Sequence, residues 1–410
     1  MSKPKVIVAH PGARLHYAVA LLLHKRQALA HFYTDNYWPT KTTLDSISSQ
    51  IPEKWIPAPI KQWKTRQVDL PKNKITAFQW LGFRYQYELK KVGTTDVFYK
   101  YNRKFGKKVA ALLGSVDANA VYGFTGSSLE IFKKAKKMGL KCILEQMSAP
   151  VAVSANVIKN EHKQWPGWQK EQATEWDLQK WVPRERSEWD LADKIISPSA
   201  YVSAELQKKG LPGDLVTSVP FAVSGHKFKP KEHTFDGKRP LRILYVGAIR
   251  LLKGIPYLLE GLSMLDPKKI EVVLIGQNYL NSGKLKKYQH LVDFKGQVPR
   301  SKLTKAYHRA DVFVMPSLCE GSATVNYEAR ACGLPAVATH TSGTWIKDGA
   351  EGFVIPRRSP EAIADGLEKF LQKPGLVSAM SQENIANTEA YTWNAYEQRL
   401  YDIAHELVSR

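Results

Sequence analysis

The stretch "DVFVMPSLCEGSATVNYEARACGLPAVATH" (residues 311–340) contains two short apolar runs on either side of a segment with helical spacing. Ser322 stands where the first helical turn needs a cap, and Gly333 followed by Pro335 ends the helix. The stretch therefore predicts a strand, a loop, a short helix and a second strand. Such a unit is typical of a parallel sheet with helices on its faces.

The same alternation continues on both sides of this unit. Two Rossmann-like doubly wound α/β domains are predicted, over residues 1–220 and 221–391, with a polar, Pro/Gly-punctuated linker at 221–240. A length of 410 residues suits two such domains. Segment 14–27 is predicted to be a helix, 150–192 to be mostly helical, and 392–410 to be an amphipathic helix. Strands are expected at 5–10, 28–35, 118–125, 141–146 and, as the last of the first domain, 193–199; the second domain is expected to have strands at 241–248, 269–276, 291–296, 311–317, 335–340 and 352–356.

Composition narrows the class of protein. Hydrophobic residues make up 43% and charged residues 24%, which is ordinary for a globular protein. Three cysteines, widely spaced, form neither a disulfide framework nor a zinc site. The longest apolar run near the N-terminus has seven residues (17–23), well short of the roughly 18 that span a bilayer. We therefore expect a cytoplasmic protein without a signal peptide or membrane-spanning helix.

Two glutamates surround the start of the helix after strand 311–317. Loops at the carboxyl ends of parallel strands bind ligands in open α/β sheets, and a helix N-terminus there attracts a diphosphate. Glu320 and Glu328 would lie on the order of 10 Å apart, which suits one carboxylate for each polyol flanking a diphosphate. The alternative is that Glu320 is a solvent-facing loop residue and Glu328 a surface residue of the helix.

Two cations occupy the loop after strand 241–248. Arg250 and Lys253 follow the turn at Gly247, again at the ligand edge of the sheet. Cations at this place can neutralise a departing diphosphate. Alternatively, one or both are solvated loop charges.

Longer motifs resemble a known family. "YVGAIRLLKGIPYLLEGL" (245–262), followed by "GQVPRSKLTKAYHRADVFVMPSLCEGSATVNYEARACGLPAVATHTSG" (296–343), is similar to the family-4 group of retaining glycosyltransferases with the GT-B fold. The resemblance covers residues 185–405 well and the first 184 in outline. It implies that the two domains face a cleft and that the final helix, 392–410, crosses back onto the first domain.

The resemblance also implies roles for single residues. Glu320 would hold the donor sugar, Glu328 the ribose, and Lys253 with Arg250 the diphosphate of a UDP- or GDP-linked sugar. No further cofactor is implied. The other donor-binding positions are Gly12, Gly247, Gln297, Val298, Ser322, Ala323, Thr324 and Val325.

The chain departs from the family pattern at three places. Ala248 stands where most members have Arg, so the diphosphate-binding role of that arginine is assigned to Arg250 instead. Ser322-Ala323 replaces the Phe-Gly of many members, which changes the sugar pocket and leaves the identity of the donor sugar undetermined. Glu145, with the glutamine after it, stands where many members have His; in its absence the departing phosphate oxygen would take the acceptor's proton.

The acceptor side is predicted less directly. His10 and Glu145 could line the acceptor pocket, although a structural role for His10 is as consistent with the sequence. Cations alternate with aromatic residues at 54–67, 78–91 and 98–108, and "FKKAKK" (132–137) adds four lysines. With a net charge of +22, this pattern suits an anionic membrane surface and hence a lipid-linked or membrane-resident acceptor. A solvated basic face with the aromatics in the core is the other interpretation.

Other activities are disfavoured by what the motifs lack. The sequence has no Asp-x-Asp or His/Cys cluster in a metal-binding context and no G-x-G-x-x-G, so neither a required metal nor a nicotinamide cofactor is expected. A nucleic-acid partner is not expected. Two alternatives stay open: a sugar-nucleotide epimerase on the same fold, and a non-catalytic basic protein that binds membranes or nucleic acid.

Overall fold

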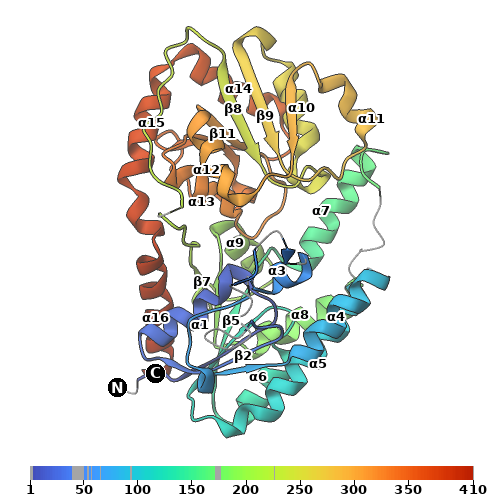
Figure 1. Ribbon diagram of the computed structural model, residues 1–410, viewed down its shortest axis with the longest axis vertical. Helices are drawn as coiled ribbons and strands as arrows, with labels where there is room; N and C mark the ends of the chain where they lie inside the picture. Colours follow the sequence, from blue (N-terminus) through green and yellow to red (C-terminus); the bar gives the residue numbers. More distant parts are fainter. Residues whose placement is uncertain are drawn as a thin grey trace.

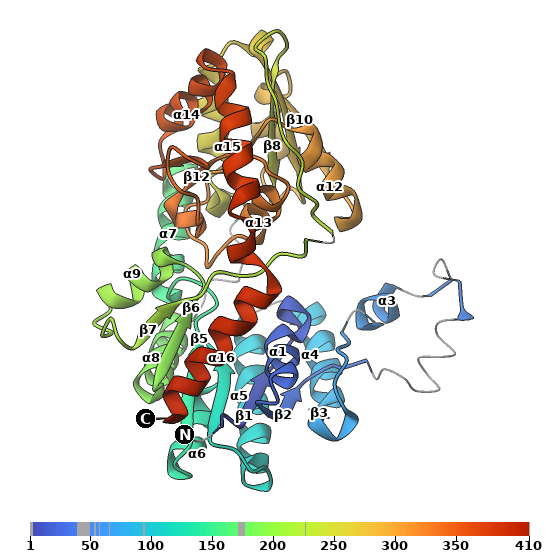
Figure 2. The ribbon, with the colours of Figure 1, turned by 90° about the vertical axis from the view of Figure 1, so that its left-hand side faces the viewer.

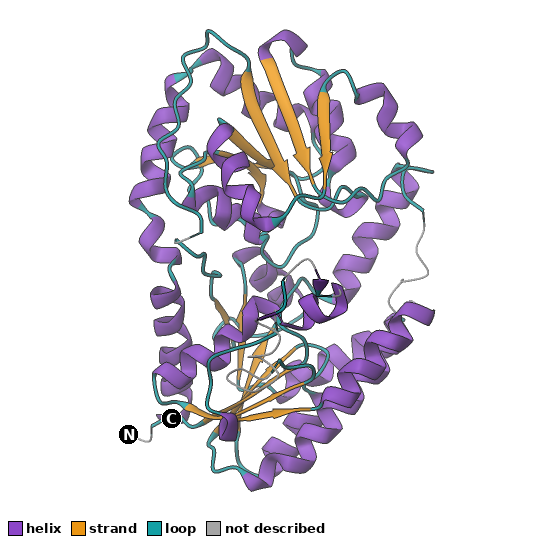
Figure 3. Ribbon diagram, viewed as in Figure 1, coloured by secondary structure: helices purple, strands orange, loops and turns teal. Residues whose placement is uncertain are grey.

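The computed structural model describes residues 3–38, 50–52, 55–56, 58–64, 66–92, 95–170, 177–225 and 227–409. Two parallel sheets lie one above the other, and helices cover the faces of each (Figures 1 and 3). Parallel strands buried on both faces need continuous apolar runs, and β1 and β11 are buried along their whole length. The two predicted Rossmann-like domains are therefore confirmed.

The first sheet has the order β3-β2-β1-β4-β5-β6-β7 within the described residues. All its neighbouring pairs are parallel. Its strands are β1 Val6–His10, β2 Leu29–Thr34, β3 Ile75–Ala77, β4 Ala120–Phe124, β5 Lys141–Glu145, β6 Lys194–Ser197 and β7 Val216–Ser218. Its helices are α1 Ala18–Lys25, α3 Ala58–Lys64, α4 Gln79–Val92, α5 Thr95–Leu112, α6 Leu129–Lys137, α7 Val151–Gln164, α8 Leu178–Leu191 and α9 Ala200–Lys208.

The second sheet has the order β10-β9-β8-β11-β12-β13, also parallel throughout. Strands β8 and β11 are neighbours at its centre, so the loops that follow them lie next to each other. Its strands are β8 Leu241–Val246, β9 Ile270–Ile275, β10 Val292–Gly296, β11 Val312–Met315, β12 Ala336–Thr339 and β13 Gly352–Ile355. Its helices are α10 Ile255–Ser263, α11 Ser282–Leu285, α12 Arg300–Arg309, α13 Thr324–Ala331, α14 Pro360–Gln372 and α15 Gly375–Ala386.

Two local predictions are corrected, and a third is confirmed. The strand at 193–199 is not the last of its sheet, because β7 pairs with it at the edge. The helix expected from residue 14 begins only at Ala18, since Arg14–Tyr17 is a 3-10 turn and Tyr17 has φ +61°. The segment 150–192 is mostly helical, as predicted, and contains the two helices α7 and α8; residues 171–176 lie outside the described residues. The division of the chain at 220/221 stays a prediction.

The C-terminal helix α16 (Trp393–Ser409) runs from the second domain down the side of the first (Figures 1 and 2). Arg26, just after α1, donates to Glu397 (2.6 Å) and Gln398 (2.7 Å), and its guanidinium lies 5.7 Å from the ring of Tyr401. Tyr396 and Leu400 are buried. The predicted crossing of this helix onto the first domain is confirmed.

Helix α7 makes a second bridge, in the opposite direction. It begins in the first domain and packs against η5 (Leu251–Lys253) of the second (Figure 1). The buried carboxylate of Glu161 accepts hydrogen bonds from Tyr257 (2.9 Å) and Arg358 (2.6 Å). Removing either partner would leave this buried carboxylate poorly compensated and would strongly destabilise the fold. These bonds therefore hold α7 against the second domain.

Candidate functional site

The two predicted loops meet at the centre of the second sheet. Lys253 follows β8, Glu320 follows β11, and their side chains form an ion pair. Both side chains are mostly buried, at 15% and 19% exposure, so the pair is better shielded than a surface salt bridge. The structure therefore brings together a cation and a carboxylate at the ligand edge of the sheet.

The loop that carries Lys253 is shaped by Gly254. Its φ is +69°, and a Cβ at this position would lie 2.1 Å from the carbonyl oxygen of Pro316, so only glycine allows this approach. The backbone N–H of Leu251 donates to the side chain of Gln169, in the segment after α7 (3.0 Å). Gln169 thus supports the cationic loop from the first domain, a contact that local sequence patterns do not indicate.

Arg250 precedes this turn but does not pair with Glu320. Its side chain is half-buried, and among the described residues its Nε has no hydrogen-bond partner. The buried ring of Tyr245 lies close enough to feel both charges. Burial raises the pKa of Tyr245 well above its ordinary value, the charge of Glu320 adds to this, and Arg250 opposes it. The Tyr245 hydroxyl donates to the carbonyl of Ala248 (2.8 Å), which fixes the turn at Gly247.

The loop that carries Glu320 is held by backbone bonds. The N–H of Glu320 donates to Thr341 (3.0 Å) and that of Ala323 to Ser342 (3.0 Å). Ser322 does not cap the helix as predicted. Helix α13 begins at Thr324 with Ala323 as its cap residue, while the hydroxyl of Ser322 binds the Tyr327 hydroxyl and the Gly343 carbonyl instead.

The opening of α13 is a place where an anion could bind. Thr324 is exposed and Val325 half-buried, whereas Ser322 and Ala323 are buried. A helix N-terminus of this kind presents backbone N–H groups and the positive end of the helix dipole. It lies four residues along the chain from Glu320.

Glu328, the second predicted carboxylate, is buried against its own domain. It accepts a hydrogen bond from Tyr307 (3.0 Å) and pairs with Arg300, whose side chain is 62% exposed. Burial raises the pKa of Glu328, an effect that Arg300 opposes. The interpretation of Glu328 as an open surface residue is wrong, and its role toward ribose stays a prediction.

Gln297 and Val298 follow β10, as predicted. Gln297 is exposed and Val298 half-buried. Arg300, which pairs with Glu328, begins α12 two residues later. The Arg300 guanidinium therefore connects the segment after β10 to Glu328. This contact brings Gln297 and Val298 toward the helix that carries Glu328, even though β10 is the edge strand of the sheet.

On the first domain, Gly12 lies in the loop after β1. Its φ is +86°, a side chain added there would meet open space, and its N–H donates to the buried carboxylate of Asp35 (2.9 Å). Asp35 also accepts from Tyr101 (2.7 Å) and pairs with Arg66 (3.2 Å). This network, which the sequence analysis missed, fixes the Gly12 loop.

His10 and Glu145 are both buried at the ends of their strands. The ring of His10 stacks on Phe124 with centroids 3.9 Å apart. Glu145 accepts from the hydroxyl of Tyr122 (2.7 Å). These contacts suit a structural role for both, and their part in acceptor binding stays a prediction.

The loop that carries Glu320 touches the first domain directly. The carbonyl of Gly321 accepts from Ser199 (2.6 Å), and a Cβ at Gly321 would lie 2.1 Å from the carbonyl oxygen of Met147. Cys319 contacts the hydroxyls of Ser154 and Tyr201, each at 3.4 Å. The loops at the carboxyl ends of the two sheets therefore meet beside Glu320.

A pocket of about 110 Å³ lies on the first-domain side of this contact. Glu185 is its buried carboxylate. It accepts from Gln146 (2.9 Å) and from the N–H of Val151 (3.0 Å), yet burial outweighs these bonds and raises its pKa to about 7. Other residues that line the pocket are Phe98, Thr125, Met147, Ser148 and Trp181.

The part of the chain that the structure describes has neither a metal-binding cluster nor a membrane-spanning helix. No group of three or more His, Cys, Asp or Glu side chains is placed there to hold a metal ion. None of the helices described is both long and apolar enough to pass through a bilayer.

Comparisons with known proteins agree with this geometry. Residues 226–387 match the family described as "Glycosyl transferases group 1". A D-inositol 3-phosphate glycosyltransferase of Paenarthrobacter aurescens (strain TC1) is 29% identical over 183 residues, 40% of this chain and 44% of that protein. The uncharacterized glycosyltransferase MJ1607 of Methanocaldococcus jannaschii is 30% identical over 190 residues, 41% and 46% of the two chains. The chain thus matches about half the length of these curated relatives.

Solved structures resemble the whole chain. Alr3699/HepE of Anabaena, crystallised with UDP, aligns with a TM-score of 0.63 at 13% identity, over 99% of this chain and 100% of that one. Sucrose-phosphate synthase (tll1590) of Thermosynechococcus elongatus aligns with a TM-score of 0.64 at 15% identity, over 100% of both. The chain therefore has the GT-B fold, and its residues 226–387 match the group 1 glycosyltransferase family.

Proposed function

We propose that this protein is a glycosyltransferase that moves a hexose from a nucleoside-diphosphate sugar to an acceptor held by the first domain. The observation that carries the proposal is the shielded Lys253–Glu320 pair at the carboxyl ends of β8 and β11. A cation and a carboxylate side by side match a donor that has a diphosphate next to a polyol. The group 1 domain match over this region supports the same conclusion.

In the proposed complex, Lys253 and Arg250 neutralise the diphosphate, together with the N–H groups of Thr324 and Val325. Glu320 accepts hydrogen bonds from the sugar hydroxyls and stabilises positive charge near the anomeric carbon. The other donor contacts are those implied by the resemblance: Glu328 to the ribose, Gln297 and Val298 to the base, and Gly12 and Gly247 as close backbone approaches.

Transfer proceeds with retention in this proposal. The bond from the anomeric carbon to the phosphate oxygen breaks, and the acceptor oxygen bonds to the same face of that carbon. The acceptor's proton passes to the departing phosphate oxygen, whose charge Lys253 offsets. This route needs no side-chain base, in keeping with Glu145 standing where many family members have His. It also needs no metal ion, since lysine and helix N–H groups supply the positive charge.

The acceptor would enter through the pocket beside Met147 and Ser148. These residues contact the loop that carries Glu320. An acceptor hydroxyl in this pocket would therefore face the carboxyl edge of the second sheet, where the donor is proposed to bind. The walls at Phe98 and Trp181 are aromatic rings stacked with centroids 5.6 Å apart, a surface suited to a sugar face or an apolar chain.

We further propose that α4 rests on an anionic lipid surface and that the acceptor is lipid-linked or membrane-resident. Trp80, Phe83 and Tyr87 lie on one face of this helix and are 86%, 41% and 60% exposed. Lys90 and Lys91 beside them are exposed, with the Lys91 ammonium 4.5 Å from the Tyr87 ring. Exposed aromatics with adjacent cations suit the headgroup region of an anionic leaflet.

This face corrects one interpretation of the basic aromatic segments. The aromatics of α4 are not all in the core, although Tyr101 and Phe105 of α5 are. Positions 54, 57 and 65 of the first basic segment lie outside the described residues. The proposed location is cytoplasmic, at the inner face of a membrane.

The first experiment is a thermal-shift panel of nucleoside diphosphates and their sugars, followed by an assay for nucleoside diphosphate release. A donor at about 100 times its Kd should stabilise the protein by roughly 2.7 kcal/mol. Comparing UDP with GDP donors decides the base. Release should require an acceptor, which distinguishes transfer from epimerisation.

Two variants sharpen this experiment. Lys253→Gln should lose most of the stabilisation by the diphosphate, and Glu320→Gln should lower turnover by at least about 100-fold, as expected for a group that stabilises developing charge. Glu361→Gln, at the exposed start of α14, is the matched control and should change neither. Unchanged turnover in Glu320→Gln would refute the assignment.

A separate experiment tests the membrane face. Cosedimentation with vesicles containing anionic lipid should exceed that with zwitterionic vesicles and fall with salt. Trp80→Ser with Tyr87→Ser should lose most of the binding, whereas Tyr279→Ser, a 40% exposed tyrosine of the second domain, should retain it. Equal binding by both variants would contradict the proposal.

A further inference from the structure

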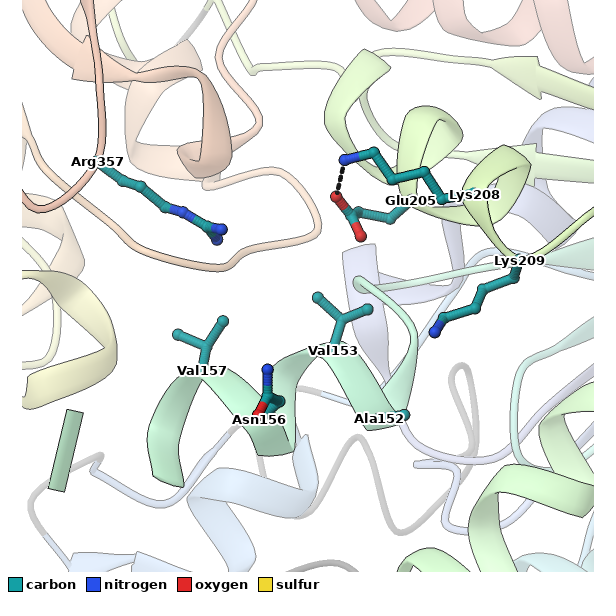
Figure 4. A pocket seen from close by; sticks show the side chains of 8 residues that line it. All are labelled: Ala152, Val153, Asn156, Val157, Glu205, Lys208, Lys209 and Arg357. Atoms are coloured by element: carbon teal, nitrogen blue, oxygen red, sulfur yellow. Dashed lines mark hydrogen bonds and ion pairs between the residues drawn. The ribbon is translucent and has the colours of Figure 1, made fainter. Parts of the chain in front are cut away.

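A second pocket, of about 430 Å³, lies between the two domains, and neither Lys253 nor Glu320 lines it (Figure 4). Its floor is α7, its second wall is α9, and Arg357, just after β13, reaches in from the second domain. Its volume falls within the range of small-molecule sites. It shares no lining residue with the proposed donor site or with the acceptor pocket, although α7 contributes different residues to each of the two pockets.

The charges around this pocket are unbalanced. Lys208, Lys209 and Arg357 line it against a single carboxylate, Glu205, which pairs with Lys208 at 2.8 Å. Among the described residues, neither Lys209 nor Arg357 forms an ion pair, and the Arg357 guanidinium makes one long hydrogen bond, to the carbonyl of Leu318 (3.5 Å). Figure 4 shows this guanidinium directed over Val157 toward the centre of the pocket.

The electrostatic effect of these cations reaches their neighbours. Burial lowers the pKa of His340, and the charges of Arg357 and then Lys208 lower it further. A positive field that disfavours protonation of a nearby imidazole also favours a bound anion. The pocket therefore has the size, the excess of cations over carboxylates in its lining and the planar donor fork that suit a phosphate.

We infer that this pocket binds a phosphorylated small molecule, held by Arg357 from one domain and Lys209 from the other. The Arg357 guanidinium also touches Leu318, two residues before Glu320. A ligand that joins Arg357 to α9 would therefore restrain the segment that carries the donor carboxylate. The site is distinct from the proposed donor site, and the inference does not depend on the transferase activity.

Isothermal titration with inorganic pyrophosphate at constant ionic strength tests the inference. The Lys253→Gln protein is used, because it weakens binding at the proposed donor site and leaves the interdomain pocket unchanged. One site should remain. Arg357→Gln or Lys209→Gln, added to this protein, should weaken the remaining site at least tenfold.

Lys159→Gln is the matched control, because Lys159 is an exposed lysine of α7 that does not line the pocket. It should change the affinity less than twofold. Loss of all binding in Lys253→Gln alone, or equal weakening by Lys159→Gln, would overturn the inference. Lys159, Lys209 and Arg357 are exposed, and Gln is close in size to Lys at position 253, so circular dichroism should show that the variants remain folded.

Discussion

The buried carboxylate of Glu185 predicts a measurable pH dependence of stability. Burial raises its pKa from the ordinary 4.5 to about 7, while Gln146, the N–H of Val151 and the charge of Lys209 oppose the rise. The folded protein therefore binds this proton more tightly than the unfolded chain does. The stability that Glu185 contributes is fully present below pH 4.5 and is lost as the pH rises toward 7.

The size of the effect follows from these two pKa values. Each unit of pKa difference corresponds to about 1.4 kcal/mol, so the complete loss is on the order of 3 kcal/mol. Between pH 5 and pH 8, linkage gives a decrease of about 2.5 kcal/mol in the free energy of unfolding. Above pH 8 the contribution is constant.

Urea unfolding at pH 5, 6, 7 and 8, followed by tryptophan fluorescence, measures this decrease. Glu185→Gln removes the titrating group, so the wild type should lose about 2.5 kcal/mol more than the variant over this range. Glu188, whose pKa burial also raises to about 7, titrates in both proteins and cancels in the comparison. The variant is expected to be less stable throughout, because Gln offers one acceptor to two donors. Parallel pH profiles for the two proteins would refute the reasoning.

Three other perturbations have defined outcomes. Gly254→Ala forces a side chain to φ +69° and against the Pro316 carbonyl, so it should cost about 1–3 kcal/mol and abolish donor stabilisation; an unchanged melting temperature would contradict this. Arg330→Met leaves the buried carboxylate of Glu351 unpaired and should cost about 3–5 kcal/mol in urea unfolding, whereas replacing both residues by Met should recover much of the loss. The three cysteines are all buried, and burial raises the pKa of Cys142 to about 12, so a disulfide reagent at pH 8 should react only after unfolding.

Much of the second domain could be predicted because its information is local. The strands ending near Val246 and Met315 are continuous apolar runs, and adjacent parallel strands place their following loops together. The meeting of Lys253 and Glu320 therefore follows from the order of elements and from the family resemblance. The short edge strands β3 and β7 have only three residues each, too few for a pattern.

The contacts that the sequence did not indicate are those between distant segments. Gln169 supports the loop of Lys253 across 82 positions, and Arg300 covers Glu328 across 28. These bonds depend on how α7 and α12 pack against the second domain, which the local spacing of residues does not encode. The burial of Glu328 and the pKa of Glu185 are likewise properties of packing rather than of spacing.

Helix α16 has a mechanical consequence for the whole protein. The backbone leaves the first domain in the segment after β7 and returns to it at the start of α16. Two separate segments of the chain therefore connect the two domains covalently. A single tether would let one half swivel freely about it. Two connections restrict twisting of one domain relative to the other. The motion that they favour is a hinge opening and closing of the two domains about the line that joins the two connections.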